Sequence, residues 1–277
     1  MNIRRPVVAG QFYPNDKKEL MDLLDQVQER EEASIDYSLA KNNIIGGVIP
    51  HAGYIFSAYQ AMHFFQILKK NNQQFDTVFI INPSHTGMGN EISFDSHDEW
   101  ETPLGKVEVD KDFAREMNIA VSEIEQEREH SGEVMVPFLQ YIIDNPFKIA
   151  PVTMTLQNYR NAVNLANNIY EANKKLNKKI LILASSDFSH FVDPETGRKL
   201  DQLVIDEILQ FNTKQVEKVI NQNNITVCGY GPIMTLMEYS KLVNQDSQTK
   251  ILKKGNSGDI IASNEVVDYV SMIFYHG

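Results

Sequence analysis

The sequence predicts an α/β protein, a three-layer αβα sandwich built around a mixed, largely buried central sheet. Several strand-like runs are almost continuously apolar, which is typical of strands in a sheet that is covered on both faces. Helical segments with one apolar face separate these runs, as expected when helices form two outer layers. The last run, residues 259–277 ("DIIASNEVVDYVSMIFYHG"), alternates in period two and indicates antiparallel strands, so the predicted sheet is mixed.

The first half of the chain is expected to supply two buried strands and two helices. The strands are predicted at residues 44–49 and 75–82, with a shorter one at 91–94. The helices are predicted at residues 15–31, with Asn15 or Asp16 as the cap, and from Ser57 onward. The segment "ETPLGKVEVD" carries a Pro-Leu-Gly turn signature and predicts two extended segments joined by a turn.

The second half continues the alternation of strands and helices. Helices are predicted at residues 134–143 and 158–177, in two stretches after residue 190, and from Pro232, because proline favours the first helical position. Strands are predicted at residues 148–154, 179–185 and 225–228. Pro151 lacks a backbone N–H, so we expect the strand that contains it to lie at a sheet edge or to end there.

Length and composition restrict the class of protein. The 277 residues are expected to form a single domain, residues 1–277. The net charge of -11 and the absence of a basic cluster argue against a nucleic-acid partner. No apolar run is long enough to span a membrane, and the start "MNIRRPVVAGQFYP" lacks the apolar core of a signal peptide, so we expect a cytoplasmic protein without a membrane partner. With Cys228 as the only cysteine, no internal disulfide can form.

Ligand-capable side chains follow four of the strand-like runs at their carboxyl sides. They are His51, His85, Asp187 with His190, and Cys228. In open α/β sheets the crevice beyond the carboxyl ends of the strands is where sites form, so these side chains converge if the strands are neighbours. Two imidazoles and a thiolate suit iron, copper or zinc, and three protein ligands leave positions open for water, oxygen or substrate.

Each of these residues also has a purely structural interpretation. A cysteine at a strand end is most often an inert, buried side chain. The loop "SSDFSH" can serve only for capping. In "EHSGEVMVPF", Ser131 can cap a helix whose first turn Glu133 supports, or His130 and Glu133 can line the crevice as an acid/base pair.

Six sequence blocks resemble the Memo family in order and approximate spacing. They are "RRPVVAGQFYP", "GVIPHAGYIFSAYQA", "INPSH", "EHSGEVMVPFLQ", "LASSDFSHF" and "CGYGPI". The similarity spans nearly the whole chain and is to the prokaryotic branch, the AmmeMemoRadiSam system protein B type. The resemblance implies a fold similar to the catalytic subunit of class III extradiol dioxygenases, which bind non-haem Fe(II) through two histidines and one carboxylate.

Matched block by block, the resemblance implies a metal site formed by His51, His85 and Cys228, with the cysteine where a dioxygenase has its carboxylate. Asp187 and His190 match residues that line the same pocket. A thiolate is a softer ligand than a carboxylate, which strengthens copper and zinc as competitors of iron and puts ring-cleaving activity in question. We therefore expect one transition metal ion per chain, Fe(II) or copper, with zinc as the alternative.

The resemblance also implies roles for the surrounding residues. His190 is a candidate general acid or base, and Asp187 either orients it or binds a substrate amine or hydroxyl. Tyr54 either lines the mouth of the crevice or packs in the core. His130 and Glu133 gain weight as residues lining the pocket.

Three functions remain open at this point. The leading hypothesis is redox chemistry at a mononuclear iron or copper centre, on an unidentified small molecule or peptide. The first alternative is a binding module without catalysis that uses the same crevice to hold a peptide or partner protein, and the second is a metal-dependent hydrolase that activates a metal-bound water. The name of the family branch also implies a pathway shared with AMMECR-type and radical SAM proteins.

Overall fold

The computed structural model describes residues 2–277. Its α-helices are α1 (Lys17–Glu31), α2 (Tyr54–Asn71), α3 (Lys111–Glu116), α4 (Val136–Ile142), α5 (Tyr159–Leu176), α6 (Pro194–Leu209), α7 (Thr213–Asn223) and α8 (Tyr230–Val243). Its 3-10 helices are η1 (Glu32–Ser34), η2 (Tyr37–Lys41), η3 (Glu133–Met135) and η4 (Ser257–Asp259). Its strands are β1 (Ile3–Arg4), β2 (Asn43–Ile49), β3 (Thr77–Pro83), β4 (Ile92–Asp95), β5 (Glu99–Thr102), β6 (Gly105–Glu108), β7 (Ala120–Ser122), β8 (Lys148–Met154), β9 (Ile180–Ser185), β10 (His190–Val192), β11 (Gln248–Asn256) and β12 (Val266–His276).

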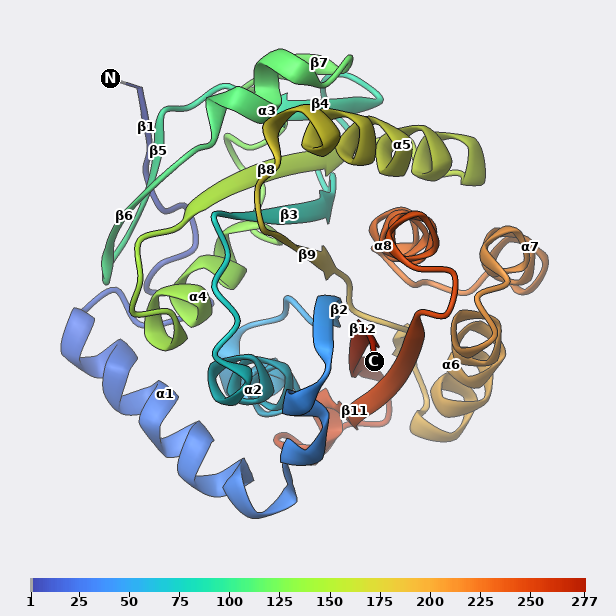
Figure 1. The fold of residues 1–277 in the computed structure, drawn as a ribbon. Helices are drawn as coiled ribbons and strands as arrows, with labels where there is room; N and C mark the ends of the chain where they lie inside the picture. The colour runs from blue at the N-terminus through green and yellow to red at the C-terminus, as the bar shows by residue number, and fades with distance from the viewer. Residues whose placement is uncertain (1) are drawn as a thin grey trace.

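A mixed nine-stranded sheet forms the centre of the molecule. Its order is β10-β12-β2-β9-β3-β8-β4-β7, with β11 paired to β12. The strands β2, β9, β3 and β8 run parallel, whereas β12 is antiparallel to β2 and β4 is antiparallel to β8. A second sheet, in the order β1-β5-β6, lies beside α4 and the amino-terminal segment (Figure 1). The predicted mixed sheet is confirmed.

Helices cover both faces of the central sheet, as the sequence predicts. In Figure 1, α2, α4 and α1 lie on one side of the sheet, and α5, α8, α7 and α6 lie on the other. The two adjacent glycines of β2 show how closely these layers approach. A Cβ atom on Gly46 would lie 2.8 Å from Leu236 of α8, and one on Gly47 would lie 2.5 Å from the ring of Phe64 in α2. Successive residues of a strand face opposite sides of the sheet, so β2 is covered on both.

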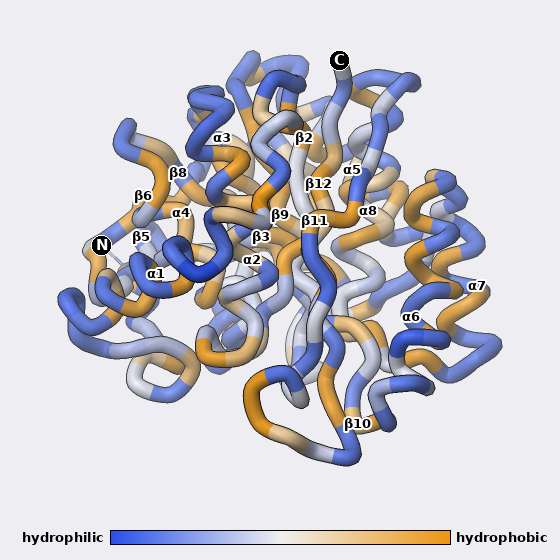
Figure 2. Tube along the Cα trace, turned by 90° about the horizontal axis from the view of Figure 1, so that it is seen from below, coloured by the Kyte–Doolittle hydropathy of each residue, from blue (hydrophilic) through white to orange (hydrophobic). Residues whose placement is uncertain are grey.

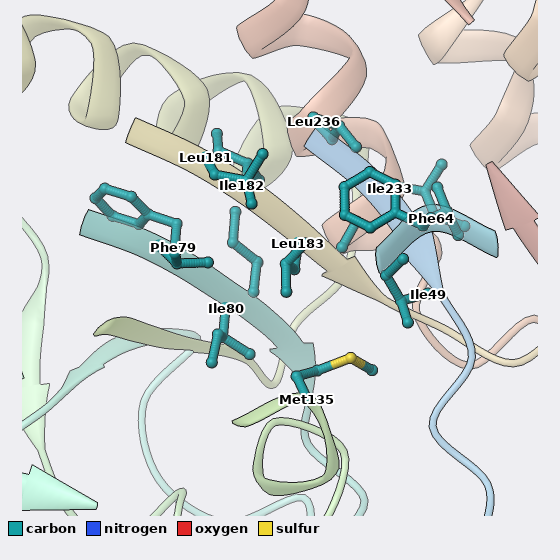
Figure 3. Packing of buried hydrophobic residues seen from close by; sticks show 14 of the residues in the cluster. Ile49, Phe64, Phe79, Ile80, Met135, Leu181, Ile182, Leu183, Ile233 and Leu236 are labelled. Atoms are coloured by element: carbon teal, nitrogen blue, oxygen red, sulfur yellow. The ribbon is translucent and has the colours of Figure 1, made fainter. Parts of the chain in front are cut away.

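The core consists of apolar side chains from the parallel strands and from helices α2 and α8. Figure 3 shows Phe79 and Ile80 of β3 beside Leu181–Leu183 of β9, with the helical side chains Ile233, Leu236 and Phe64 at the right of the view and Met135 below Ile80. Among the side chains in this view, Phe79, Ile80, Leu183 and Ile233 are fully buried. The outer elements are more polar: β11, at the sheet edge, is largely hydrophilic in Figure 2, and lysines on an edge strand discourage pairing with another chain.

Four local expectations are wrong. The helix expected from Pro232 begins two residues earlier, at Tyr230, with Gly229 as its cap. Residues 225–228 form no strand but a loop that ends in a turn before α8. Pro151 lies inside β8 and between two neighbouring strands, rather than at an edge. This position is tolerated because β4 pairs with β8 only from Val152 to Met154 and therefore requires no donor from Pro151. The helix expected from Ser57 begins three residues earlier, at Tyr54, with Gly53 as its cap.

No helix within residues 2–277 combines the length and the apolar character that crossing a membrane requires.

Candidate metal centre

The order of the parallel strands brings the predicted ligands to one edge of the sheet. Since β2, β9 and β3 are direct neighbours, the segments that follow them lie side by side. These segments carry His51, Asp187 and His85, respectively. Cys228 arrives from the loop before α8 instead of from a strand. This loop passes so close to the end of β9 that a Cβ atom on Gly229 would lie 2.1 Å from the Ser185 carbonyl oxygen.

His51, His85 and Cys228 form a compact set of possible metal ligands. One nitrogen from each imidazole and the Cys228 sulfur lie within 4.8 Å of one another. The Cys228 Sγ is 3.2 Å from His51 Nε2. The rings of His51 and His85 meet edge to face, with centroids 5.2 Å apart. Two imidazoles and one sulfur at this spacing fit a transition metal with open coordination positions.

The hydrogen bonds of Ser185 define which nitrogen of His51 can bind a metal. The Ser185 hydroxyl donates to the Ser131 carbonyl oxygen at 2.7 Å. It must then accept from His51 Nδ1, which lies 2.8 Å away, so the proton is on Nδ1. The free lone pair is on Nε2, which faces Cys228. Metal-ligating histidines are commonly oriented in this way by an acceptor for the N–H of their other nitrogen.

Glu129 performs the same task for His85. Its buried carboxylate accepts from His85 Nδ1 at 2.8 Å and from the His85 backbone N–H at 2.6 Å. Ser131 adds two more donors to this carboxylate, its backbone N–H and its hydroxyl. Burial alone would raise the pKa of Glu129, but the hydrogen bonds and charge of His85 outweigh it and lower the pKa to about 2. Glu129 therefore stays ionised and leaves Nε2 of His85 for a metal.

Of the two other ligands, His51 is in the protonation state that binds a metal at neutral pH, and Cys228 is not. Burial, together with the neighbouring imidazoles, places the pKa of His51 well below its usual value, so His51 is a neutral, ligand-competent imidazole. Burial and the nearby Asp187 raise the pKa of the Cys228 thiol well above its usual value. A metal ion that binds Cys228 must therefore displace a proton, which makes its affinity dependent on pH.

Asp187 and His190 frame the ligand set from the loop "SSDFSH". The Asp187 carboxylate accepts from the His51 backbone N–H at 2.7 Å, and its own N–H donates to Cys228 Sγ at 3.3 Å. Burial raises the pKa of Asp187 to about 6. His190 is tied to Thr226, whose carbonyl oxygen lies 2.8 Å from His190 Nδ1. A carbonyl only accepts, so Nδ1 carries the proton and Nε2 of His190 remains an acceptor.

The residue after His190 has an unusual backbone. Phe191 adopts a left-handed conformation, with φ +55°, and its side chain is 73% exposed. A bulky residue in this region is strained, and such strain concentrates at ligand-binding and catalytic segments.

Of the three other residues predicted to line the pocket, His130 lies beside the ligands, whereas Tyr54 and Glu133 are buried and bonded to other parts of the chain. His130 joins the cluster: its ring centroid lies 4.6 Å from that of His85, and burial lowers its pKa to about 4. Tyr54 is buried, packs against Phe138 and donates to the Val134 carbonyl oxygen, which matches the packing interpretation. Glu133 is also buried and accepts from Arg4, from the backbone of Val7 and Val8, and from the Tyr13 hydroxyl.

His85, Glu129 and His130 form a second group with ligand-like spacing. The Glu129 oxygens already accept four hydrogen bonds, two from His85 and two from Ser131. A metal at this position would have to break them, so the group serves to hold His85.

The sequence interpretation missed Ser185 and Glu129, which orient the two imidazoles. Both stand beside residues that it singled out, Ser185 at the start of "SSDFSH" and Glu129 directly before His130. Nothing in a single sequence shows that their side chains turn toward the imidazoles of other segments.

Comparisons with known proteins show the family and the fold of the chain. A family model described as "Memo-like protein" matches residues 4–273. The "MEMO1 family protein" of Methanobrevibacter smithii is 39% identical over 285 residues, which cover 98% of this chain and 99% of the relative. That of Methanococcoides burtonii is 36% identical over 274 residues, again covering 98% and 99%. The fold is similar to that of the uncharacterized protein JW3007 from Escherichia coli K12, with a TM-score of 0.55 at 10% identity over 83% of this chain and 99% of that one. The chain belongs to the Memo family.

Proposed function

We propose that this protein binds one iron or copper ion per chain through His51, His85 and Cys228, and that it uses the ion in redox chemistry. The observation that carries the proposal is the convergence of these three side chains within 4.8 Å. Ser185 and Glu129 support it, because each holds the Nδ1 of one imidazole and leaves the Nε2 for a metal. Zinc is the competing ion for such a ligand set.

When bound, such an ion supplies open coordination positions and one-electron chemistry. The chain's own residues would handle the proton and orient the substrate. His190 is suited to accept a proton at Nε2 because Thr226 holds its Nδ1–H. Asp187 holds the His51 backbone and, through its own N–H, the Cys228 sulfur, so it fixes the spacing of two ligands.

The proposal also includes the substrate, the cellular compartment and the pathway. The substrate is an unidentified small molecule or peptide. A reducing cytoplasm would keep the Cys228 thiol available as a ligand. A pathway shared with AMMECR-type and radical SAM proteins would supply or consume the substrate.

The test is a comparison of wild type with Cys228→Ser, purified without oxygen. Each protein is loaded separately with Fe(II), Cu(I) and Zn(II) and assayed by elemental analysis. We expect about one metal ion per wild-type chain with at least one of these metals, and loss of stoichiometric binding in the variant, because a serine hydroxyl is a much poorer ligand than a thiolate. Ser240→Ala is the matched control, since Ser240 is buried in α8 and its hydroxyl donates only to the Leu236 carbonyl oxygen of the same helix. Absence of stoichiometric binding by reduced wild type would overturn the proposal and favour a binding module without catalysis.

A hydrolase is the second candidate, favoured by the acceptor Nε2 of His190, whose Nδ1–H is held by the Thr226 carbonyl oxygen. Turnover of ester or amide substrates by the zinc-loaded protein, with no oxygen-dependent reaction of the iron- or copper-loaded protein, would replace the redox assignment with this one.

A further inference from the structure

A pair of buried aspartates lies behind the loop that carries Asp187 and His190. Asp201 is on α6 and Asp268 is on β12, and each is only 4% exposed. The two residues border one cavity, and the elements that carry them, α6 and β12, pack against each other. Within residues 2–277, Asp268 Oδ2 has no N–H or O–H partner. Two ionised carboxylates buried at one contact repel each other, and a proton held between them removes this repulsion.

The chain is shaped around this contact. A Cβ atom on Gly197 would lie 2.1 Å from Asp268 Oδ2, so α6 can approach Asp268 only because residue 197 is glycine. Gly197 and Asp201 are four residues apart and therefore share one face of α6. On this face, Gly197 leaves room for the Asp268 carboxyl group, and Asp201 presents a second carboxyl group beside it.

The pair is bonded to the loop between the two catalytic candidates. Asp201 Oδ1 accepts from the Ser189 N–H at 3.0 Å and from the Ser189 hydroxyl at 2.6 Å. The backbone of Asp268 accepts from the Phe188 N–H and donates to the Ser189 carbonyl oxygen, both at 2.9 Å. Phe188 and Ser189 are the two residues between Asp187 and His190.

Other charged groups surround the pair without neutralising it. A cavity of about 320 Å³ borders both carboxyl groups. Its other titratable residues are Arg198 on α6, Lys254 on β11, Asp259 in η4 and Tyr269 on β12. The Lys254 ammonium donates to Gln202 at 2.9 Å. Its charge lowers the pKa of Asp201, and the charge of Arg198 lowers that of Asp268, but burial of the two carboxyl groups outweighs both effects.

We propose that Asp201 and Asp268 share one proton, and that this shared proton positions the Phe188–Ser189 segment and with it Asp187 and His190. Both are positioning residues, since neither touches the proposed metal ligands. The importance assigned to the segment rests on the proposed function, whereas the shared proton does not.

The electrostatics of the pair give the sign of the pH effect. Burial, followed by the charge of Asp201, raises the pKa of Asp268 to about 7, and burial also raises the pKa of Asp201. An aspartate in the unfolded or opened chain titrates near about 4. The proton therefore stabilises the closed segment most below this value, and its contribution falls as the pH rises toward 7.

The test is amide hydrogen exchange on the metal-free protein between pH 5 and pH 8, corrected for the intrinsic exchange rate. In wild type, we expect the Phe188, Ser189 and Asp268 amides to lose at least about tenfold protection over this range, because opening becomes easier as the proton is lost. Asp268→Asn supplies a permanent N–H donor to Asp201, so protection should become independent of pH. Asp201→Asn should also make protection independent of pH, because its amide donates to Asp268. It replaces the first variant if that one does not fold.

Asp259→Asn is the matched control, because Asp259 faces the same cavity but is not part of the pair. It should retain the wild-type pH dependence. The proposal is overturned if wild-type protection does not change with pH, or if a folded Asp268→Asn or Asp201→Asn variant retains the wild-type profile. Restoration of wild-type protection at pH 8 by Ca²⁺ or Mg²⁺ would also overturn it and assign the pair to a cation. Because no metal is loaded at the histidines, failure here is separate from failure of the proposed metal centre.

Discussion

At the scale of single residues, the candidate centre depends on side chains that never touch the metal. A histidine can bind through either nitrogen, and the wrong tautomer offers an N–H where a lone pair is needed. Ser185 and Glu129 each take up the Nδ1–H of one imidazole, so each ring, when neutral, carries its lone pair on Nε2. This preparation distinguishes the cluster from three polar residues that meet by chance.

Removing the hydroxyl of Ser185 should weaken metal binding without removing a ligand. In Ser185→Ala, the buried His51 Nδ1–H and the Ser131 carbonyl oxygen both lose their partner. We expect metal affinity to fall by about 10- to 100-fold, the usual effect of losing such a partner. Competition with a chelator of known affinity measures the change, with Ser240→Ala as the buried control that should leave affinity unchanged. Equal affinities for Ser185→Ala and wild type would contradict the role assigned to Ser185.

The ligands themselves could be predicted from sequence, but their orientation could not. His51 and His85 follow apolar strands, and this pattern is visible in one dimension. Cys228 was singled out for the wrong structural reason, since its segment is a loop and not a strand. It reaches the site because Gly229 lets that loop pass against β9, a contact between segments that lie far apart in the sequence.

At the scale of elements, the glycines of β2 set the spacing of the sheet. Gly46 pairs with Ile182 of β9, and its missing side chain lets the two strands lie against α8. His51 and Asp187 follow the ends of β2 and β9 by two residues, so the separation of these strands controls the distance between the two residues. A close approach of backbones, and not a turn, explains these glycines.

Gly46→Ala should therefore be strongly destabilising. Its Cβ atom would lie 2.1 Å from the Ile182 carbonyl oxygen, and a backbone atom cannot move aside as a side chain can. We expect the free energy of unfolding, measured in urea, to fall by about 3 kcal/mol or more, at the upper end for overpacked sites. Gly53→Ala is the comparison, because its nearest neighbour would be 3.5 Å away; it should lose only about 1 kcal/mol through a poorer helix cap. Similar losses in both variants would show that crowding at Gly46 is relieved elsewhere.

Most helices and strands could be predicted because their apolar patterns are visible within a short segment. The errors arise where a strand depends on pairing with a segment that lies far away in the sequence. Pro151 suggests an edge strand, yet β8 lies between β3 and β4 and tolerates the proline because β4 pairs only with the residues that follow it, Val152 to Met154. The edge strand β11 was not predicted, since its sequence "QTKILKKGN" is too polar to indicate a strand by itself. It is stabilised by β12, which pairs with it along most of its length.

At the scale of the whole molecule, Arg4 ties the amino-terminal segment to the loop that orients His85. Its buried guanidinium donates to the carbonyl oxygens of Gln126 and Glu129 and to the Glu133 carboxylate, and lies over the ring of Trp100. Glu129 in turn holds His85. The small sheet at the edge of the fold is therefore connected to the candidate centre through Arg4, which donates to the Glu129 carbonyl oxygen and is neutralised by Glu133.

Arg4→Met should destabilise the protein far more than the same change at its neighbour. Arg4 and Glu133 form a buried pair with an N–O distance of 2.7 Å, and removing the arginine leaves the carboxylate without a compensating charge. We expect a loss of about 3–5 kcal/mol in the free energy of unfolding. Arg5 makes an ion pair of the same length with Glu101, but its side chain is 78% exposed, so Arg5→Met should cost less than about 1 kcal/mol.

Urea unfolding of both variants at neutral pH, followed by metal titration of the folded protein, tests this connection. Arg4→Met should also bind metal more weakly, because the 126–133 segment that carries Glu129 loses three of its hydrogen bonds to Arg4. Adding Glu133→Leu should not restore stability, since Val7, Val8 and Tyr13 would then lose their common acceptor. If Arg4→Met and Arg5→Met prove equally mild, the amino-terminal segment is held by packing alone, and the ion pair does not connect it to the centre.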